Sequence, residues 1–197
     1  MLCFNHSISF KKLALADLVL LTKWLAEPHV RAWWHEALTL EEARKRYGPR
    51  IDGSEPCYVY IILSSATPVG FIQWYRWADY PEHSLQLEAA PDSAGIDLAI
   101  GEKDLIGCGL GTQAICQFIQ EGIFQDSSIS SVIADPEERN AQSIGAFKKA
   151  GFVSGKLVQL LGEPFSRRVV RFNKSINSKK ACDRFRGWAE AHPTHQF

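Results

Sequence analysis

A run of glycines near the middle of the chain has the residue types and spacing of a phosphate-binding turn. Gly107, Gly109 and Gly111 follow the apolar segment 95–100, and an apolar stretch that predicts a helix over residues 109–123 comes next. A ligand can approach glycine closely because it has no Cβ, and N–H groups at a helix start attract anions. The turn therefore predicts a site for phosphate or pyrophosphate. The alternative is a tight connection that simply needs glycine.

A second motif follows a predicted strand over residues 129–134 and the Asp135-Pro136 pair that ends it. It runs from Asn140 to Phe152 and reads N-x-x-S-x-x-x-F-x-K-x-G-F. Gly151 predicts the end of a short helix. The glycine turn and this helix together resemble the GNAT acetyltransferase superfamily, in which the turn holds the pyrophosphate of acetyl-CoA and the helix lies beside the pantetheine arm.

The resemblance extends over about residues 8–174 and points to one branch of the superfamily. Its further pieces are Trp33-Trp34, residues 68–75, residues 95–97 and Asp135-Pro136. Their order and spacing are similar to the aminoglycoside 6'-N-acetyltransferases. The resemblance implies an N-acetyltransferase that acts on the 6'-amine of an aminoglycoside by direct transfer in a ternary complex.

The same resemblance implies the fold and the co-substrate. We expect an α/β (α+β) fold, with a mixed, largely antiparallel central sheet flanked by helices, in one domain over residues 1–174. Acetyl-CoA is the implied co-substrate, and no metal is expected. The residues implied to bind it are Leu98, Ala99, Ile100, Gly107, Gly109, Gly111, Thr112, Asn140, Ser143, Phe147 and Lys149.

Acetyl transfer to an amine needs a neutral amine, a polarised thioester carbonyl and two reactants held in line. The resemblance implies a backbone N–H near Leu98 for the carbonyl. It implies that Asp97 and Asp135 hold substrate ammonium groups and help to deprotonate the reacting one. Trp34 and Tyr75 are predicted to line the same cleft, and Trp77 is a further candidate for stacking on a sugar.

Local acidity predicts a cationic acceptor. Seven carboxylates gather in a segment where Lys103 is the one opposing charge: Asp79, Glu82, Glu88, Asp92, Asp97, Glu102 and Asp104. Such a segment would attract a polycationic amine. For most of the seven, a solvated loop face is the favoured interpretation.

Two positions depart from the family pattern. Phe147 stands where the family often has a tyrosine that protonates the departing thiolate. Here a water or another residue must supply that proton, or CoA must leave as the thiolate. Ile106 stands where an arginine or glutamine often contacts phosphate. A non-catalytic acyl-CoA-binding protein is therefore one alternative, and a GNAT enzyme for another amine, such as a siderophore precursor, is a second.

Two other readings of the turn are weaker. Gly109 and Gly111 also fit a relaxed dinucleotide fingerprint, but too little chain follows for a second nucleotide-binding half. Cys108 could act as a nucleophile, yet no histidine lies nearby in sequence to activate it.

Composition limits the function classes. The 197 residues carry 22 basic and 22 acidic side chains, and the zero net charge argues against a nucleic-acid binder driven by bulk charge. No apolar run approaches the ~20 residues of a membrane span. Five cysteines without C-x-x-C spacing predict free thiols in a reducing cytoplasm. A monomer or a homodimer is expected.

Periodicity and breakers predict the elements. A strand over 8–13 precedes a helix over 15–25, and Pro28 stops that helix. Thr39 caps a helix that Gly48-Pro49 ends near Tyr47. Strands over 57–63 and 69–75 form a hairpin through residues 64–68, and residues 78–93 form a loop. Strands over 152–161 and 165–172 follow the second motif. Residues 175–178 predict a linker before a C-terminal helix over 179–191.

Overall fold

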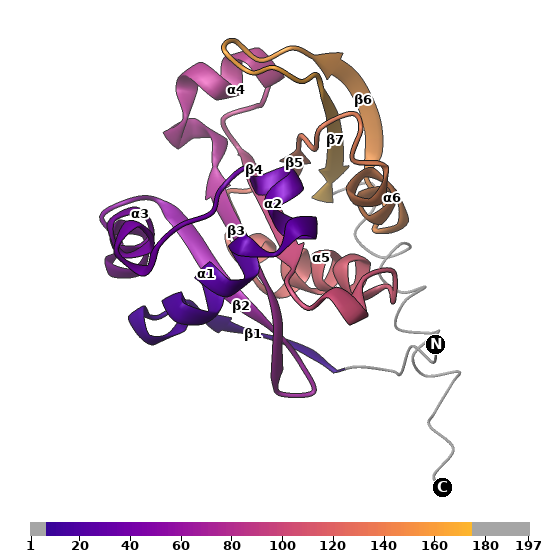
Figure 1. Cartoon of the computed structure of the whole chain (residues 1–197). Coiled ribbons are helices and arrows are strands. Elements are labelled where there is room, and N and C mark those ends of the chain that lie inside the picture. The colour runs from indigo at the N-terminus through magenta and orange to yellow at the C-terminus, as the bar shows by residue number, and fades with distance from the viewer. Residues whose placement is uncertain (1–6, 175–197) are drawn as a thin grey trace, which may run out of the picture.

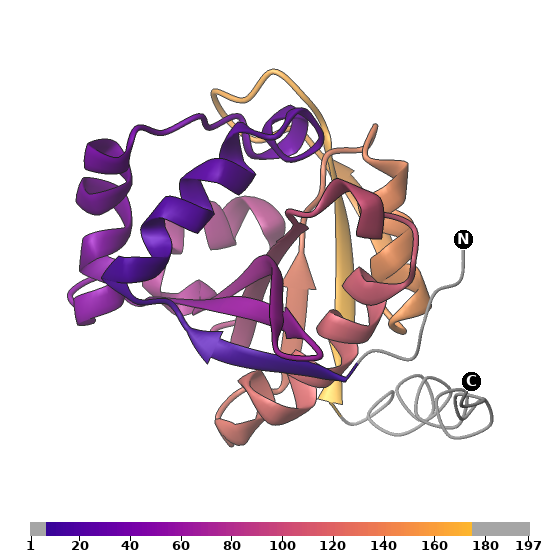
Figure 2. The same ribbon diagram turned by 60° about the horizontal axis from the view of Figure 1, so that its bottom comes forward.

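A seven-stranded sheet with helices on both faces forms the framework of the molecule (Figures 1 and 2). The computed structural model describes residues 7–174. The strands, in their order across the sheet, are β1 (Ile8–Lys12), β2 (Cys57–Ser64), β3 (Thr67–Arg76), β4 (Ser93–Ile100), β5 (Ser131–Ala134), β7 (Arg167–Asn173) and β6 (Val153–Val158). β4 and β5 run parallel and every other neighbouring pair is antiparallel. The predicted mixed, largely antiparallel α/β fold is confirmed.

Helices from the two halves of the chain cover opposite faces of the sheet, as Figure 2 shows. The helices are α1 (Leu18–Ala26), α2 (Pro28–Trp34), α3 (Leu40–Asp52), α4 (Pro81–Leu87), α5 (Leu110–Glu121) and α6 (Ala141–Lys149). Side chains alternate across a strand, so Phe71 packs with α1 and α3 while the adjacent Ile72 packs with α5. This alternation decides which strand residues face which cavity.

One edge of β4 has no strand partner along residues 96–100, because β4 and β5 separate after Gly95. We call this the free edge of β4. Its parallel pairing to β5 covers residues 93–95 and ends at Gly95, opposite Ile133. Beyond that point β4 is paired with β3 alone, through Ile100 opposite Gly70. The other edge of residues 96–100 is therefore left without a strand partner, and both cavities described below lie along it.

Gly95 also makes room for the ring of Tyr75 on the neighbouring strand. A Cβ added to Gly95 would lie 2.3 Å from the ring of Tyr75, far inside van der Waals contact. The ring thus lies over the glycine, on the face of the sheet that also carries Asp97. Tyr75 and Asp97 are brought together by this register.

The helix ends differ from the predictions in two places. α1 ends at Ala26, before Pro28 as predicted, but Pro28 also begins a second helix, α2, at a position that needs no backbone N–H. Gly48-Pro49 was expected to end the helix that begins after Thr39. In fact α3 continues through Pro49 to Asp52, and Gly53 (φ 88°) ends it. The predicted cap is confirmed, because the Thr39 side chain accepts from the N–H of Glu42 while the Glu42 side chain reaches back.

The hairpin and the loop after it are tighter than predicted. β2 and β3 are joined by Ser65 and Ala66 alone, both with positive φ (48° and 67°), instead of a five-residue connection. Residues 78–93 were expected to be a loop, but Pro81 begins α4. Figure 1 shows α4 next to the β6–β7 connection, where Leu161 N–H donates to Gln86 Oε1 at 2.8 Å.

The predicted linker and C-terminal helix of residues 175–197 lie outside the described residues. Within residues 7–174, none of the helices combines the length and the apolar character needed to cross a lipid bilayer.

Candidate active site

The glycine turn lines one cavity, which we call the glycine cavity. Its volume is about 400 Å³. The turn, the free edge of β4 and one face of α6 enclose it, with residues that include Leu98, Ala99, Ile100, Gly107, Gly109, Gly111, Thr112, Asn140, Ser143 and Lys149. Ten of the eleven residues predicted to bind the co-substrate therefore lie around one space.

The turn has the backbone geometry that anion binding requires. Gly107 and Gly109 have φ values of 80° and 84°, a region that favours glycine. A Cβ added at either residue would meet nothing within 4 Å, so the space beside them is open. Gly109 is the N-cap of α5, and the first N–H groups of this helix have no intrahelical partner. A phosphate placed there would meet these N–H groups and the positive end of the helix dipole.

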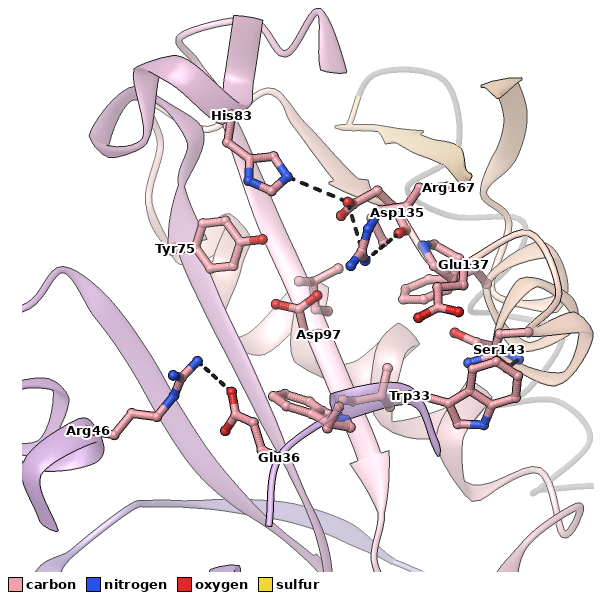
Figure 3. A pocket seen from close by; sticks show the side chains of 17 residues that line it. Trp33, Glu36, Arg46, Tyr75, His83, Asp97, Asp135, Glu137, Ser143 and Arg167 are labelled. Atoms are coloured by element: carbon pink, nitrogen blue, oxygen red, sulfur yellow. Dashed lines mark hydrogen bonds and ion pairs between the residues drawn. The ribbon is translucent and has the colours of Figure 1, made fainter. Parts of the chain in front are cut away.

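A second cavity, of about 360 Å³, adjoins the first, and we call it the acidic cavity. Its lining contains four carboxylates, those of Glu36, Asp97, Asp135 and Glu137. Figure 3 shows the labelled side chains around this space, which come from α2, α3, α4, α6, β3, β4, β7 and the segments after α2 and β5. Five residues line both cavities: Trp33, Trp34, Leu98, Asn140 and Ser143. The two spaces therefore meet beside the free edge of β4.

Asp97 is the carboxylate whose proton affinity is most useful for chemistry. Burial, and after it the nearby charge of Asp135, raise the pKa of Asp97 to about 6, against the lowering effect of a hydrogen bond from Gln73. The Gln73 Nε2 group donates that bond to Asp97 Oδ2 at 3.0 Å. A carboxylate with this pKa is ionised at neutral pH and accepts a proton more readily than an ordinary aspartate.

Asp135 lies deeper, between the guanidinium group of Arg167 and the imidazole of His83. Its side chain is 7% exposed, and its Oδ2 atom is 3.7 Å from both Arg167 Nη1 and His83 Nε2. These separations are ion pairs rather than hydrogen bonds. Arg167 also donates to the Asp135 backbone carbonyl at 3.2 Å. The pKa of His83 is raised, chiefly by its interaction with Asp135.

The other two carboxylates are also paired. Glu36 lies 2.5 Å from Arg46, and burial raises the pKa of Glu36 in spite of that neighbour. Glu137 bonds His35, and Arg139 Nε donates to its other oxygen at 2.7 Å. Burial opposes the ionisation of Glu137, but these partners lower its pKa. Asp97 alone among the four has an amide rather than a cation as its direct partner in the described residues.

Comparison with known proteins identifies the family. A model of the acetyltransferase (GNAT) domain matches residues 14–160, about three quarters of the chain. The chain belongs to the GNAT acetyltransferase family.

Relatives within the GNAT family differ in the acceptor that their names state. An aminoglycoside N(6')-acetyltransferase type 1 of Klebsiella pneumoniae is 29% identical over 151 residues, 75% of each chain. A lysine N-acyltransferase, MbtK, of Mycolicibacterium paratuberculosis is 24% identical over 139 residues, 70% of this chain and 61% of the relative. The aminoglycoside acetyltransferase AAC(6')-Ib, solved with coenzyme A and kanamycin, superposes with a TM-score of 0.78 at 25% identity, over 91% of this chain and 99% of that one.

Most residues that the GNAT resemblance singled out lie at the two cavities. Asp97, Asp135, Trp34 and Tyr75 all line the acidic cavity. Phe147 lies there too, instead of at the glycine cavity, and is 3% exposed with its ring 4.9 Å from that of Phe152.

One candidate on the acceptor side is wrong, and most of the acidic segment is exposed, as the solvated-face interpretation predicts. Trp77 is 1% exposed, in a core cluster with Leu87, and so has no surface to offer a sugar. Of the seven acidic residues between 79 and 104, Asp97 is the one that lines the acidic cavity. Glu102 instead accepts from Trp24 Nε1 at 2.8 Å, and Glu88 pairs with Lys156.

The sequence reasoning missed several residues of the acidic cavity. Glu36 and Glu137 follow the predicted Trp33-Trp34 and Asp135-Pro136 motifs within a few residues, so position next to a motif was a usable signal. Arg46, His83 and Arg167 had no such signal, because they come from three distant elements. Cys108, the candidate nucleophile, is absent from the described lining of either cavity.

Proposed function

We propose that this protein is an acetyl-CoA-dependent N-acetyltransferase that acetylates the 6'-amino group of aminoglycosides by direct transfer in a ternary complex. The observation that supports this is the junction of the two cavities at Trp33, Trp34, Leu98, Asn140 and Ser143. One space offers backbone donors to an anion, and the other offers carboxylates to a cation. Two reactants of opposite charge would meet beside β4.

The glycine cavity fits acetyl-CoA in charge and shape. Gly109, Gly111 and Thr112 would hold the pyrophosphate through backbone N–H groups at the start of α5. Lys149, at the end of α6, adds a positive charge to the same cavity and offsets the loss of a phosphate contact at Ile106. The free edge of residues 98–100 would pair with the amide groups of the pantetheine arm, since its own backbone groups have no strand partner there.

The chemistry divides between the two walls of the junction. Asp97 would take the proton of the acceptor ammonium and leave a neutral amine to attack. A backbone N–H near Leu98 would stabilise the negative charge that builds on the thioester oxygen. Phe147 has no proton to give, so the thiolate would leave unassisted or take its proton from water. The ordinary thiol pKa of about 8.5 makes this feasible near neutral pH.

Two of the similar proteins support an aminoglycoside acceptor. The N(6')-acetyltransferase of Klebsiella pneumoniae carries the proposed activity in its name, and the AAC(6')-Ib structure holds coenzyme A together with kanamycin. Trp34 and Tyr75 would offer aromatic surface to a sugar ring or an ammonium group.

A second candidate acceptor is a siderophore precursor amine. Arg46 and Arg167 line the acidic cavity together with the four carboxylates, and three of those carboxylates already have arginine partners. A cavity of this kind would also accommodate an amine that carries an anionic group. The lysine N-acyltransferase MbtK names an acceptor of this kind. An N-hydroxyputrescine acetyltransferase of Acinetobacter baumannii (28% identical over 123 residues) names another amine acceptor, which has no anionic group.

Thiol release from acetyl-CoA tests the proposal. The acceptors are an aminoglycoside with a 6'-amine, the matched aminoglycoside with a 6'-hydroxyl, lysine and N-hydroxyputrescine. We expect turnover with the first, none with the second, and a single acetyl group on the 6'-nitrogen by mass spectrometry and NMR. Turnover restricted to lysine or N-hydroxyputrescine would support the second candidate. Acetyl-CoA binding without turnover on any amine would indicate a non-catalytic acyl-CoA-binding protein.

A further inference from the structure

A chain of side-chain hydrogen bonds reaches Asp97 from behind the acidic cavity. Arg50, in the last turn of α3, donates through Nε to Glu55 Oε1 at 2.9 Å. It also donates through Nη1 to Gln73 Oε1 at 3.1 Å. Gln73 Nε2 then donates to Asp97 Oδ2 at 3.0 Å. Gln73 and Asp97 lie directly opposite each other on β3 and β4, so the sheet register itself brings the last two groups together.

The guanidinium group of Arg50 fixes which end of the Gln73 amide faces Asp97. A guanidinium group has donors and no acceptor, so the oxygen of the Gln73 amide must face Arg50. The nitrogen of the same amide must then face Asp97. Gln73 is 8% exposed, and the side chain of Arg50 is 14% exposed. Turning the amide round would place its NH₂ group against the guanidinium, and a buried donor would lose its partner at a large cost.

Gln73 does not line either cavity, so it would act through Asp97 and not on a substrate. We propose that Gln73, oriented by Arg50, is a positioning residue that keeps Asp97 Oδ2 as a hydrogen-bond acceptor and leaves Oδ1 as the atom that takes the proton from the acceptor amine. This inference rests on the proposed function. In the step concerned, the N–H bond of the ammonium breaks and an O–H bond forms at Oδ1. The nitrogen keeps the electron pair with which it attacks the thioester carbon, and the C–S bond breaks to release the thiolate. The second proton of the attacking nitrogen then passes to water or to the thiolate, which leaves a neutral amide.

Several charged and titratable groups besides Gln73 influence the pKa of Asp97. Asp135 after β5 faces it, as do Tyr75 on β3, Cys57 on β2, Arg167 on β7 and Arg50 on α3. Burial and Asp135 raise the pKa of Asp97, while the bond from Gln73 and the two arginines lower it. Without the hydrogen bond from Gln73, burial and Asp135 would still raise the pKa of Asp97. Asp97 would then be protonated at neutral pH and unable to accept the amine proton.

The test compares pH profiles of kcat/KM for the amine acceptor in the unaltered enzyme and in Gln73→Leu, Arg50→Met and Arg50→Lys. A base with this pKa must be ionised, so activity of the unaltered enzyme is present above about pH 6 and falls below it. We expect Gln73→Leu to move this acid limb upward by about one to two pH units, roughly ten- to a hundredfold in proton affinity, the size of a lost charge-assisted hydrogen bond. Most of the activity should return at higher pH.

Arg50→Met should move the limb in the same direction, and Arg50→Lys by less, because lysine keeps a cation that can donate to Gln73. Arg76→Met is the matched control. It lies on the same strand as Gln73, pairs with Asp126 and should leave the limb in place. A uniform loss of activity at every pH, with no movement of the limb in Gln73→Leu, would show that Gln73 merely supports the fold and would overturn the proposal.

A second readout needs no turnover. The titration of the Asp97 carboxyl carbon, followed by NMR of protein labelled with ¹³C-aspartate and assigned with Asp97→Asn, should shift upward in Gln73→Leu and Arg50→Met. If no acceptor gives turnover, the proposed function fails and this titration still decides the role of Gln73. An unchanged titration in a folded Gln73→Leu protein would refute the role.

Discussion

Asp97→Asn should make the protein more stable while it removes acetyl transfer. Burial and Asp135 raise the pKa of Asp97 from 3.8 to about 6, so the folded state holds this proton more tightly than the unfolded chain does. Ionisation of Asp97 therefore opposes folding, and it does so increasingly once the pH exceeds the unfolded-state pKa. Asparagine removes the charge and still presents an oxygen that can accept the bond from Gln73 Nε2.

The magnitude follows from the two pKa values. Each unit of difference is about 1.4 kcal/mol, so the ionised carboxylate costs about 3 kcal/mol of unfolding free energy at pH 7.5. The penalty grows as pH rises from 3.8 to 6 and is constant above. At pH 4.5 the folded protein already holds the proton, and the same linkage leaves a penalty of about 1 kcal/mol. The stability gained by Asp97→Asn should therefore shrink as pH falls.

Urea unfolding at both pH values measures this difference. Asp92→Asn, which removes a carboxylate from an exposed position just before β4, is the control and should leave the unfolding free energy nearly unchanged. In the transfer assay kcat/KM for the amine should fall by roughly 10²- to 10⁴-fold, the range for a lost general base, with unchanged affinity for acetyl-CoA. If Asp97→Asn is no more stable than the unaltered protein at pH 7.5, Asp97 is not a destabilising buried charge and its assignment as the base loses its physical ground.

Two further predictions concern the co-substrate side. Gly111→Asp should weaken acetyl-CoA binding in calorimetry and leave folding intact, because its Cβ would meet Ile100 at an ordinary 3.9 Å while its carboxylate repels phosphate at the start of α5. Gly111→Asn has the same shape without the charge and should bind more tightly than Gly111→Asp, so equal affinities in the two variants would count against a pyrophosphate at this turn. Phe147→Tyr should leave kcat nearly unchanged or raise it between pH 6 and 9. A drop of about 10²-fold or more in a folded protein with normal acetyl-CoA affinity would mean that another residue already supplies the proton.

The glycine cavity could be predicted from the sequence because the residues that form a phosphate-binding turn lie close together in the chain. Glycines with positive φ must occur where the chain turns into α5, and a phosphate site at a helix start uses backbone groups that lie within a few residues of one another. The spacing of Gly107, Gly109 and Gly111 is therefore enough to predict a phosphate-binding turn. The strands could be predicted for a similar reason, since short runs rich in apolar residues, such as 57–63, are bounded by turn residues.

The acceptor side was less accessible because its charges are balanced between distant elements. The acidic segment before and after Asp97 suggested an excess of negative charge. However, Glu88 forms an ion pair with Lys156, and Glu102 accepts a hydrogen bond from Trp24. The carboxylates that do line the acidic cavity are balanced by Arg46 and Arg167, which lie on α3 and β7. Charge counted along a segment therefore gives a poor estimate of charge in a cavity.

Gln73 illustrates the same limit at a single position. In the sequence it is a polar residue in the apolar strand 69–75, and no spacing links it to Asp97 or to Arg50. The antiparallel register of β3 and β4 places it opposite Asp97, and the continuation of α3 past Pro49 brings Arg50 to its other end. A helix that stopped at Gly48-Pro49, as the sequence suggested, would leave the Gln73 amide free to turn. The length of α3 and the proton affinity of Asp97 are thus two parts of one arrangement, and a change that shortens α3 should act on the acid limb of the reaction.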